Sequence, residues 1–274
     1  LHRRTRQDPV RCGAREDRQR ARRWLVTAFG AYSRYYDLLY RDKAYGDEAA
    51  HISQLIRDRA PSATTLLELG CGTGGHAVKL AEHGFAIHGV DLSDTMLAAA
   101  RQHANAKLTF ELGDARTVRV GRTFDAVISV FHVMSYQTTN ADLAAAFATA
   151  RAHLASGGVF VFDCWYGPAV LTDRPVVRVR EIADDHVEVT RIAEPVMHAE
   201  ENIVDVNYHV FLRDKPTGER SELRETHRMR YLFSPEVAQF LDAAGFELVG
   251  AREWLTNEPL SYRSWNACFV ARAK

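Results

Sequence analysis

The 274-residue sequence has few cysteines, no long apolar run and no net charge, and each absence excludes a class of protein. Its four cysteines form no C-x-x-C pair and no secretory segment precedes them, which suits a reducing cytoplasm better than a disulfide scaffold. No apolar run approaches the roughly 18 residues that a membrane span needs. The 35 basic and 35 acidic residues cancel, so nothing attracts the chain globally to nucleic acid or to an anionic membrane. These absences predict a cytoplasmic protein with neither nucleic acid nor a membrane as its partner.

The balanced charge hides a basic segment at the start of the chain. Residues 1–23 contain nine arginines and only three acids, and almost no apolar residues. Such a segment cannot offset the entropy of ordering by burying apolar surface. We predict a disordered leader over residues 1–25, with a nucleic-acid arm or an Arg-rich targeting peptide as the alternatives.

The rest of the chain begins with helices and continues as alternating strands and helices. Residues 26–60 have the apolar spacing of helices that cap a core, the second of them at 45–57. Short apolar strands are then expected at 65–69, 85–90, 108–110, 125–130 and 159–162, separated by helices at 76–83, 93–102 and 141–154. This alternation predicts a parallel sheet that is covered by helices on both faces.

Residues 170–232 follow a different pattern. Apolar and polar residues alternate with a period of two at 177–180, 187–190 and 204–208, and a turn is expected at 215–218. We therefore predict an antiparallel β insertion with one face in solvent. A helix from Ser234, as its N-cap, to Gly245 and strands at 246–250 and 267–270 then complete the core, which comprises residues 61–169 and 233–274.

The most informative motif is LLELGCGTG, which spans Leu66–Gly74 between a strand and a helix. Glycines at such a turn let a ligand approach the backbone closely. The spacing also satisfies G-x-G-x-x-G, which by itself is a weak dinucleotide fingerprint. Glu68 discriminates, because a nearby carboxylate disfavours a pyrophosphate but suits the ammonium and sulfonium of S-adenosylmethionine.

Two further acids follow the next two strands. Asp91, at the end of the second strand, can accept hydrogen bonds from both hydroxyls of a ribose, a feature shared with NAD enzymes. Asp114, after the third strand, can accept from the amine of adenine, although Gly-Asp is also a common turn. Together they indicate a nucleoside without deciding which one.

In this order the segments resemble the class I S-adenosylmethionine-dependent methyltransferases over about residues 30–165. The resemblance implies a Rossmann-like, doubly wound α/β sheet of seven strands, the last of them antiparallel, here with an antiparallel β insertion. It places the methionine end around Glu68 and Gly70, the ribose at Asp91 and the adenine near Leu92. The expected cofactor residues are Tyr36, Glu68, Gly70, Gly72, Gly74, Asp91, Leu92, Met96, Asp114, Ala115 and Val130.

A narrower resemblance concerns the acceptor. The string YDLLY at 36–40, with Lys43 and Tyr45, and the string ETHR at 225–228 resemble enzymes that methylate the amino group of nucleotide-linked deoxysugars. By this resemblance Tyr36 closes over the cofactor, Trp165 lines the acceptor pocket and Arg263 meets the phosphates of the nucleotide. Arg228 is a further candidate for binding a diphosphate.

The segment Phe131–Tyr136 follows the fourth strand and departs from this second family, whose members carry a histidine at the position of Tyr136. We name Tyr136 and the nearby His132 as catalytic candidates, with a pocket-wall role for Tyr136 and a structural role for His132 as the alternatives. We find no metal-ligand spacing and expect no metal. An amine acceptor is favoured, since a hydroxyl needs a general base or a metal.

The predicted function is methyl transfer from S-adenosylmethionine to a small-molecule acceptor. A small-molecule O- or carboxyl methyltransferase is the alternative within this class. An NAD-type oxidoreductase, for which the Y-x-x-x-K of the short-chain form is missing, and a noncatalytic methyltransferase-like subunit are the alternatives outside it. The oligomeric state stays open, with a homodimer allowed.

Overall fold

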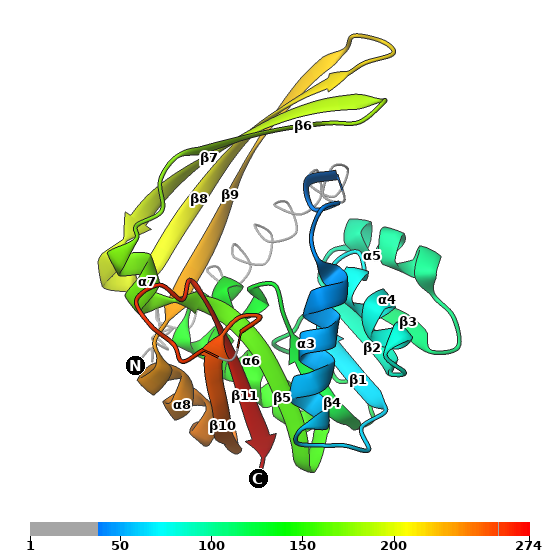
Figure 1. The fold of residues 1–274 in the computed structure, drawn as a ribbon, viewed down its shortest axis with the longest axis vertical. Coiled ribbons are helices and arrows are strands. Elements are labelled where there is room, and N and C mark those ends of the chain that lie inside the picture. The colour runs from blue at the N-terminus through cyan, green and yellow to red at the C-terminus, as the bar shows by residue number, and fades with distance from the viewer. Residues whose placement is uncertain (1–37, 257) are drawn as a thin grey trace, which may run out of the picture.

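One continuous sheet organises the molecule, and helices cover its parallel half (Figure 1). The computed structural model describes residues 38–256 and 258–274. The predicted leader 1–25, much of the predicted N-terminal helical region and Tyr36 lie outside the described residues.

Seven strands form the core of this sheet, in the order β3-β2-β1-β4-β5-β11-β10. Their bounds are Thr65–Leu69 (β1), Ala86–Asp91 (β2), Leu108–Leu112 (β3), Phe124–Ser129 (β4), Leu154–Tyr166 (β5), Phe246–Glu253 (β10) and Asn266–Ala273 (β11). β1 to β5 pair in parallel, and β11 is antiparallel to both of its neighbours, β5 and β10. The predicted seven-stranded, doubly wound sheet with an antiparallel last strand is confirmed.

The helices bury the two faces of this sheet. Their bounds are Tyr45–Arg57 (α3), Gly75–Glu82 (α4), Asp94–Ala100 (α5), Asn140–Ala152 (α6), Gly167–Thr172 (α7) and Ser234–Ala243 (α8), with 3-10 turns at Arg101–His103, Val133–Tyr136 (η2) and Ala199–Glu201. β5 shows why both faces need cover, because Phe160 and Phe162 join one apolar cluster with α6 and α8 while Val159 and Val161 join the other with α3 and α4. None of the helices in the described residues has the length and apolarity to cross a membrane.

The insertion consists of four antiparallel strands, β6 (Arg178–Ala183), β7 (Val187–His198), β8 (Ile203–Asp214) and β9 (Arg220–Leu232). Three were predicted, and β9 was missed. The end of β9 pairs in parallel with the end of β5, at Trp165 and Tyr166, so the insertion continues the core sheet. It rises as an arch beyond the ends of the parallel strands (Figure 1).

Several predicted boundaries move. β5 extends from Leu154, so the Gly157-Gly158 pair lies inside a strand and does not end the preceding helix, which stops at Ala152. Phe233, not Ser234, is the N-cap of α8, and its backbone N–H donates to Glu236 Oε2 at 3.3 Å.

Candidate functional site

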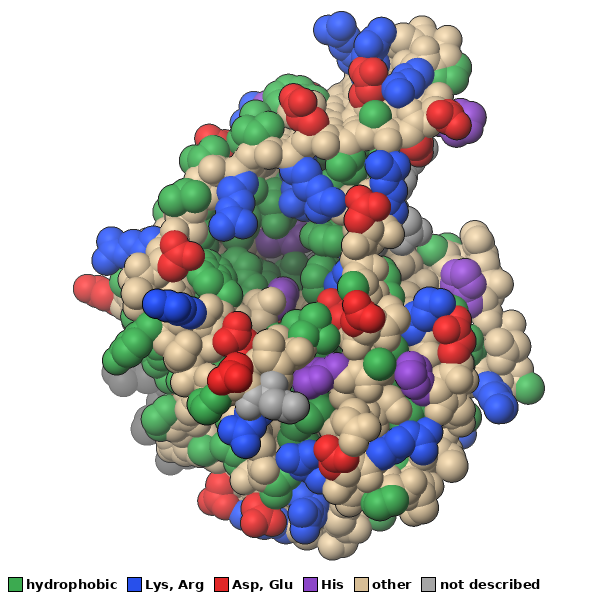
Figure 2. Space-filling model, in the orientation of Figure 1, with side chains coloured by type: hydrophobic (Ala, Val, Ile, Leu, Met, Phe, Trp, Pro, Cys, Tyr) green, Lys and Arg blue, Asp and Glu red, His purple; other side chains and the backbone are tan. Residues whose placement is uncertain are grey.

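A cavity opens where the parallel strands end and the arch begins. Figure 2 shows the hollow between the core and the insertion, with basic side chains along its upper rim. Most of the predicted site residues line this cavity: Gly70, Gly72, Asp91, Leu92, Met96, Asp114, Ala115, Val130, His132, Tyr136 and Trp165. Glu68 and Gly74 lie outside the lining, and Tyr36 lies outside the described residues.

The glycine turn between β1 and α4 has the conformation that the motif predicts. Gly70 and Gly72 have φ angles of +81° and +55°, which only glycine adopts freely. A Cβ on Gly70 would come within 2.5 Å of Val133, whereas nothing lies within 4 Å of the position of a Cβ on Gly72. Gly72 therefore presents bare backbone to the cavity, where a ligand can approach it closely.

Glu68 sits beneath this turn with an unsatisfied oxygen. Its side chain is 1% exposed, and within the described part of the chain its Oε2 has no hydrogen-bond partner. Its Oε1 lies 3.8 Å from His76 Nδ1. Burial and the neighbouring Asp91 raise the pKa of Glu68 to about 8, although Lys43 acts in the opposite direction. An arriving cation would satisfy the carboxylate, so the site fits the ammonium of the expected cofactor.

Lys43 lies close enough to Glu68 for its charge to lower the pKa of that carboxyl. Its ammonium pairs with Glu48 and lies 4.6 Å from the ring centres of both Tyr45 and Phe131. His76 Nε2 contacts the same Glu48 oxygen at 2.5 Å. This buried cluster fixes helix α3 against the glycine turn.

Asp91 holds the turn as well as facing the cavity. Its Oδ2 accepts from the Gly72 backbone N–H at 2.8 Å, and its Oδ1 accepts from the Ser93 N–H at 2.9 Å. Burial raises the pKa of Asp91, and these backbone hydrogen bonds act in the opposite direction. Each carboxylate oxygen keeps capacity for a further donor, so ribose hydroxyls can still bind there.

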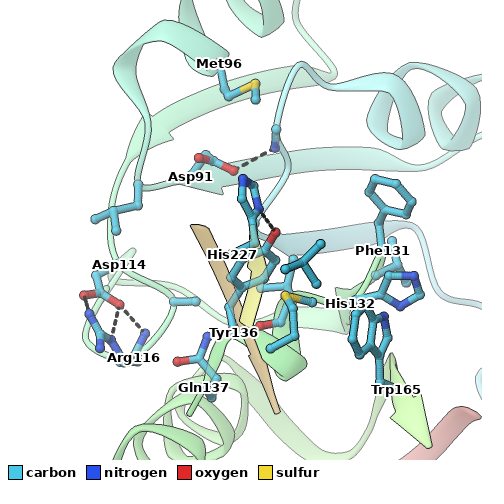
Figure 3. A pocket seen from close by; sticks show the side chains of 18 of the residues that line it. Asp91, Met96, Asp114, Arg116, Phe131, His132, Tyr136, Gln137, Trp165 and His227 are labelled. Atoms are coloured by element: carbon cyan, nitrogen blue, oxygen red, sulfur yellow. Dashed lines mark hydrogen bonds and ion pairs between the residues drawn. The ribbon is translucent and has the colours of Figure 1, made fainter. Parts of the chain in front are cut away.

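Asp114 is engaged by a neighbouring arginine. Arg116 Nε and Nη2 donate to Asp114 Oδ1 and Oδ2 at 2.9 and 2.7 Å, and Arg116 Nη1 donates to Asp142 at 3.0 Å. This bidentate pair fixes the carboxylate at the cavity wall (Figure 3). An adenine amine that donates to Asp114 would therefore share this carboxylate with Arg116. The sequence did not indicate that Arg116 pairs with Asp114.

The segment after β4 adopts a strained conformation. Phe131 and His132 have φ angles of +64° and +66°, an arrangement that costs about 1–3 kcal/mol per non-glycine residue. The buried Asp163 stabilises it, since its Oδ1 accepts from the His132 N–H at 2.9 Å. Its Oδ2 lies 2.8 Å from His132 Nδ1, although not in hydrogen-bond geometry. His132 is thus tied to the core from both its backbone and its ring.

Tyr136 meets a histidine from the insertion. Its hydroxyl lies 2.7 Å from His227 Nδ1, and His227 Nε2 lies 3.4 Å from Glu225 Oε2. Tyr136 and His227 both line the cavity and lie at the centre of the site, with Asp91 and Asp114 to one side (Figure 3). Burial raises the pKa of Tyr136 well above its usual range.

The arginines predicted to hold phosphate lie outside the cavity lining. Arg228 alternates along β9 with His227 and Met229, which line the cavity, so it points to the opposite face. There it pairs with Glu201 and lies 3.7 Å from Asp205. Arg263 is exposed in the loop before β11.

Sequence reasoning missed the residues that the arch contributes to the cavity. These are Val206, Tyr208, His227 and Met229, and Tyr40 and Phe131 join them from elsewhere. The period of two in β8 could have placed Val206 and Tyr208 on one face. His227 belongs to the string ETHR at 225–228, from which only a family resemblance was inferred.

Comparison with known proteins agrees with this geometry. Residues 66–158 match the family model described as a methyltransferase domain. The chain is 34% identical over 215 residues to the dTDP-3-amino-3,4,6-trideoxy-alpha-D-glucopyranose N,N-dimethyltransferase of Streptomyces venezuelae, covering 78% of this chain and 89% of that protein. The crystal structure of DesVI from S. venezuelae superimposes with a TM-score of 0.76 at 29% identity, covering 89% of this chain and 98% of that one. CalS10, an amino pentose methyltransferase from Micromonospora echinaspora solved with S-adenosylmethionine bound, gives 0.72 at 29% identity, with 87% and 96% covered.

Proposed function

We propose that this chain, which belongs to the S-adenosylmethionine-dependent methyltransferases, transfers methyl groups to the amino nitrogen of a nucleotide-linked deoxysugar. The observation that carries the proposal is the continuity of one cavity. It runs from the glycine turn and Asp91, on the core, to Tyr208 and His227, on the arch. Tyr136 and Trp165 line the same cavity, and we place the transfer of the methyl group beside them.

The cofactor supplies an activated methyl group on a positively charged sulfur, which leaves as a neutral thioether. Because the leaving group needs no help, the protein contributes alignment and the exclusion of water. We assign the ammonium to Glu68, the ribose to Asp91 and the adenine to the wall formed by Leu92, Met96 and Ala115. Gly72 would lie against the methionine end, where its missing side chain leaves room.

Aromatic side chains line the acceptor side of the cavity. Trp165 packs edge to face on Trp265, with ring centres 5.5 Å apart, and Tyr208 packs edge to face on His227 at 4.9 Å. Such walls suit the apolar face of a deoxysugar, which lacks some of the hydroxyls that would need partners. They do not suit the extended, exposed surface that a protein or a nucleic-acid acceptor would need.

A nucleotide-linked acceptor also needs cations for its diphosphate. Strand pairing places Arg178, Arg180 and Arg191 on the cavity face of β6 and β7, because Arg191 pairs with Val210 on the same face as Tyr208. Arg180 lies directly opposite Arg191, and two like charges placed in this way favour the binding of an anion. The Arg191 guanidinium lies 4.8 Å from the ring centre of Tyr208, which lines the cavity. We propose that this basic rim, together with Arg263, binds the diphosphate.

We further propose a cytoplasmic location. Cys71, Cys164 and Cys268 are buried and unpaired, as in proteins of reducing compartments. A homodimer stays a prediction, and light scattering of the purified protein tests it.

The acceptor is tested with a panel of matched compounds and S-adenosylmethionine, by measuring the formation of S-adenosylhomocysteine. The panel pairs a nucleoside-diphosphate amino sugar with its hydroxyl counterpart, with the free amino sugar, and with a simple amine and a carboxylic acid. The proposal expects kcat/KM to be highest for the nucleotide-linked amine. Turnover of the hydroxyl or the acid alone would assign the chain to the O- or carboxyl methyltransferases instead.

A further inference from the structure

A line of buried polar groups leads away from the proposed reaction centre into the arch. It begins at the Tyr136 hydroxyl, which contacts Nδ1 of His227 (Figure 3). It continues through the imidazole to Nε2 and ends at Glu225. The side chains of His227 and Glu225 are each 5% exposed. Glu225 Oε1 has no hydrogen-bond partner within the part of the chain that the structure describes.

One assignment of the hydrogens lets these groups pass a proton along the line. A protonated phenol can donate to Nδ1, which must then be the unprotonated nitrogen of a neutral imidazole. Nε2 consequently carries the hydrogen and faces the Glu225 carboxylate. This tautomer can accept a second proton at Nδ1, and the carboxylate would stabilise the resulting imidazolium.

Tyr136 cannot act as a base by itself. Burial holds its pKa well above the usual range, so its phenolate is not populated near neutral pH. It can pass a proton only if its own proton has somewhere to go, and His227 is the acceptor that it contacts.

We propose that His227 is the proton acceptor of this site, reached through the Tyr136 hydroxyl and held by Glu225. The inference rests on the proposed amine acceptor. A sugar amine arrives largely as an ammonium ion and has no lone pair until it loses a proton. The arch places a histidine one hydrogen bond behind the Tyr136 hydroxyl, within reach of the proton that the amine must lose.

Proton transfer precedes the transfer of the methyl group. The ammonium N–H bond breaks and its proton bonds to Tyr136 Oη, while the Oη–H proton moves to His227 Nδ1. The freed nitrogen lone pair then bonds to the methyl carbon, and the carbon–sulfur bond breaks with its electron pair passing to sulfur. The methylated ammonium leaves, and the imidazolium returns its proton to solvent before the next turnover.

The groups facing His227 from each neighbouring element are Glu225 on its own strand, Tyr136 on η2, Tyr208 on β8 and, beyond Tyr208, Arg191 on β7. Tyr40 lies close enough to raise the pKa of both Tyr136 and Tyr208. Of these, Glu225 contacts the imidazole directly, whereas Arg191 is separated from it by the Tyr208 ring.

The test compares kcat at saturating substrates from about pH 6.5 to pH 9.5 for the unmodified chain, Tyr136→Phe, His227→Asn and the double variant. Near neutral pH each single variant should lose at least about a hundredfold in kcat. The double variant should lose no more, since the groups act in series. The losses should shrink as the pH rises, because the amine then arrives already neutral.

His209→Asn is the matched control. His209 also pairs with a glutamate, Glu222 at 3.0 Å, but lies on the face of β8 opposite to Tyr208. The His209→Asn variant should have the same kcat as the unmodified chain at every pH. All variants should bind S-adenosylhomocysteine with a Kd within about twofold of that of the unmodified chain.

Two results overturn the inference in distinguishable ways. If the unmodified chain methylates an amine but the ratio of its kcat to that of His227→Asn is the same at every pH, His227 only packs against Tyr136 and the relay is wrong. If the unmodified chain methylates no amine, the proposed function fails and the inference fails with it.

Discussion

Replacing Glu68 by glutamine tests how the cofactor's ammonium is held. With a pKa of about 8 before ligand binds, roughly nine in ten Glu68 carboxyls are protonated at pH 7. If the ammonium binds the carboxylate, binding must remove that proton. The Kd for S-adenosylhomocysteine, which keeps the ammonium but lacks the sulfonium, should then fall about tenfold from pH 6 to pH 7 and level off near pH 8.

The same titration affects stability in the opposite direction. Raising the pH strengthens ligand binding but lowers the free energy of unfolding of the protein without ligand. Because the folded state raises the pKa of Glu68 above its ordinary 4.5, the empty protein binds more protons than the unfolded chain between about pH 4.5 and 8. Its free energy of unfolding should therefore fall as the pH rises through this range, and bound ligand should restore it.

Titration calorimetry from pH 6 to pH 8, in two buffers of different ionisation enthalpy, measures both the Kd and the proton released. Glu68→Gln should bind about 10- to 100-fold more weakly at pH 8, since a charge-assisted hydrogen bond is lost. Its Kd should also lose the pH dependence. A flat Kd in the unmodified chain, or the same slope in Glu68→Gln, would refute the assignment of Glu68 to the ammonium.

Three further predictions concern the cofactor, the acceptor and the leader. Asp91→Ala should weaken cofactor binding by about 2–4 kcal/mol in calorimetry, because ribose loses a charged acceptor, and more if the freed Gly72 N–H loosens the turn; an unchanged Kd would place the ribose elsewhere. Arg263→Ala should raise the KM of the acceptor far more than that of the cofactor, whereas Arg228→Ala, on the opposite face, should change neither; equal effects would show a general charge effect. A chain beginning at Val26 should keep its melting temperature within a few degrees in thermal denaturation, and a large loss would mean that the leader packs on the core.

The core of the fold was predictable because each strand of the parallel sheet is an apolar run bounded by turn residues. The glycine turn, Glu68 and Asp91 were predictable for the same reason, since their positions follow directly from the ends of strands. In a parallel sheet these ends meet at one edge, so separate motifs in the sequence converge in space.

Strand β9 of the arch was harder to predict because polar residues interrupt its apolar pattern. Glu225 and His227 occupy positions of β9 that face inward, where an apolar residue would have marked a strand. The same alternation, once β9 is recognised, turns Arg228 outward. The pairing of Arg116 with Asp114 and the contact of Tyr136 with His227 depend on tertiary packing, which no local pattern encodes.

The central claim is that a methyl group passes from sulfur to the nitrogen of a nucleotide-linked amino sugar within this cavity. The most direct measurement uses S-adenosylmethionine with a ¹³C-labelled methyl group and follows the label by NMR after reaction with a nucleoside-diphosphate amino sugar. The account predicts that the label appears as a methyl group correlated through nitrogen with the amine-bearing ring carbon. A label attached to a hydroxyl oxygen of the sugar would contradict it, as would a label that stays on the cofactor in this reaction but is transferred to a different class of acceptor in a parallel reaction.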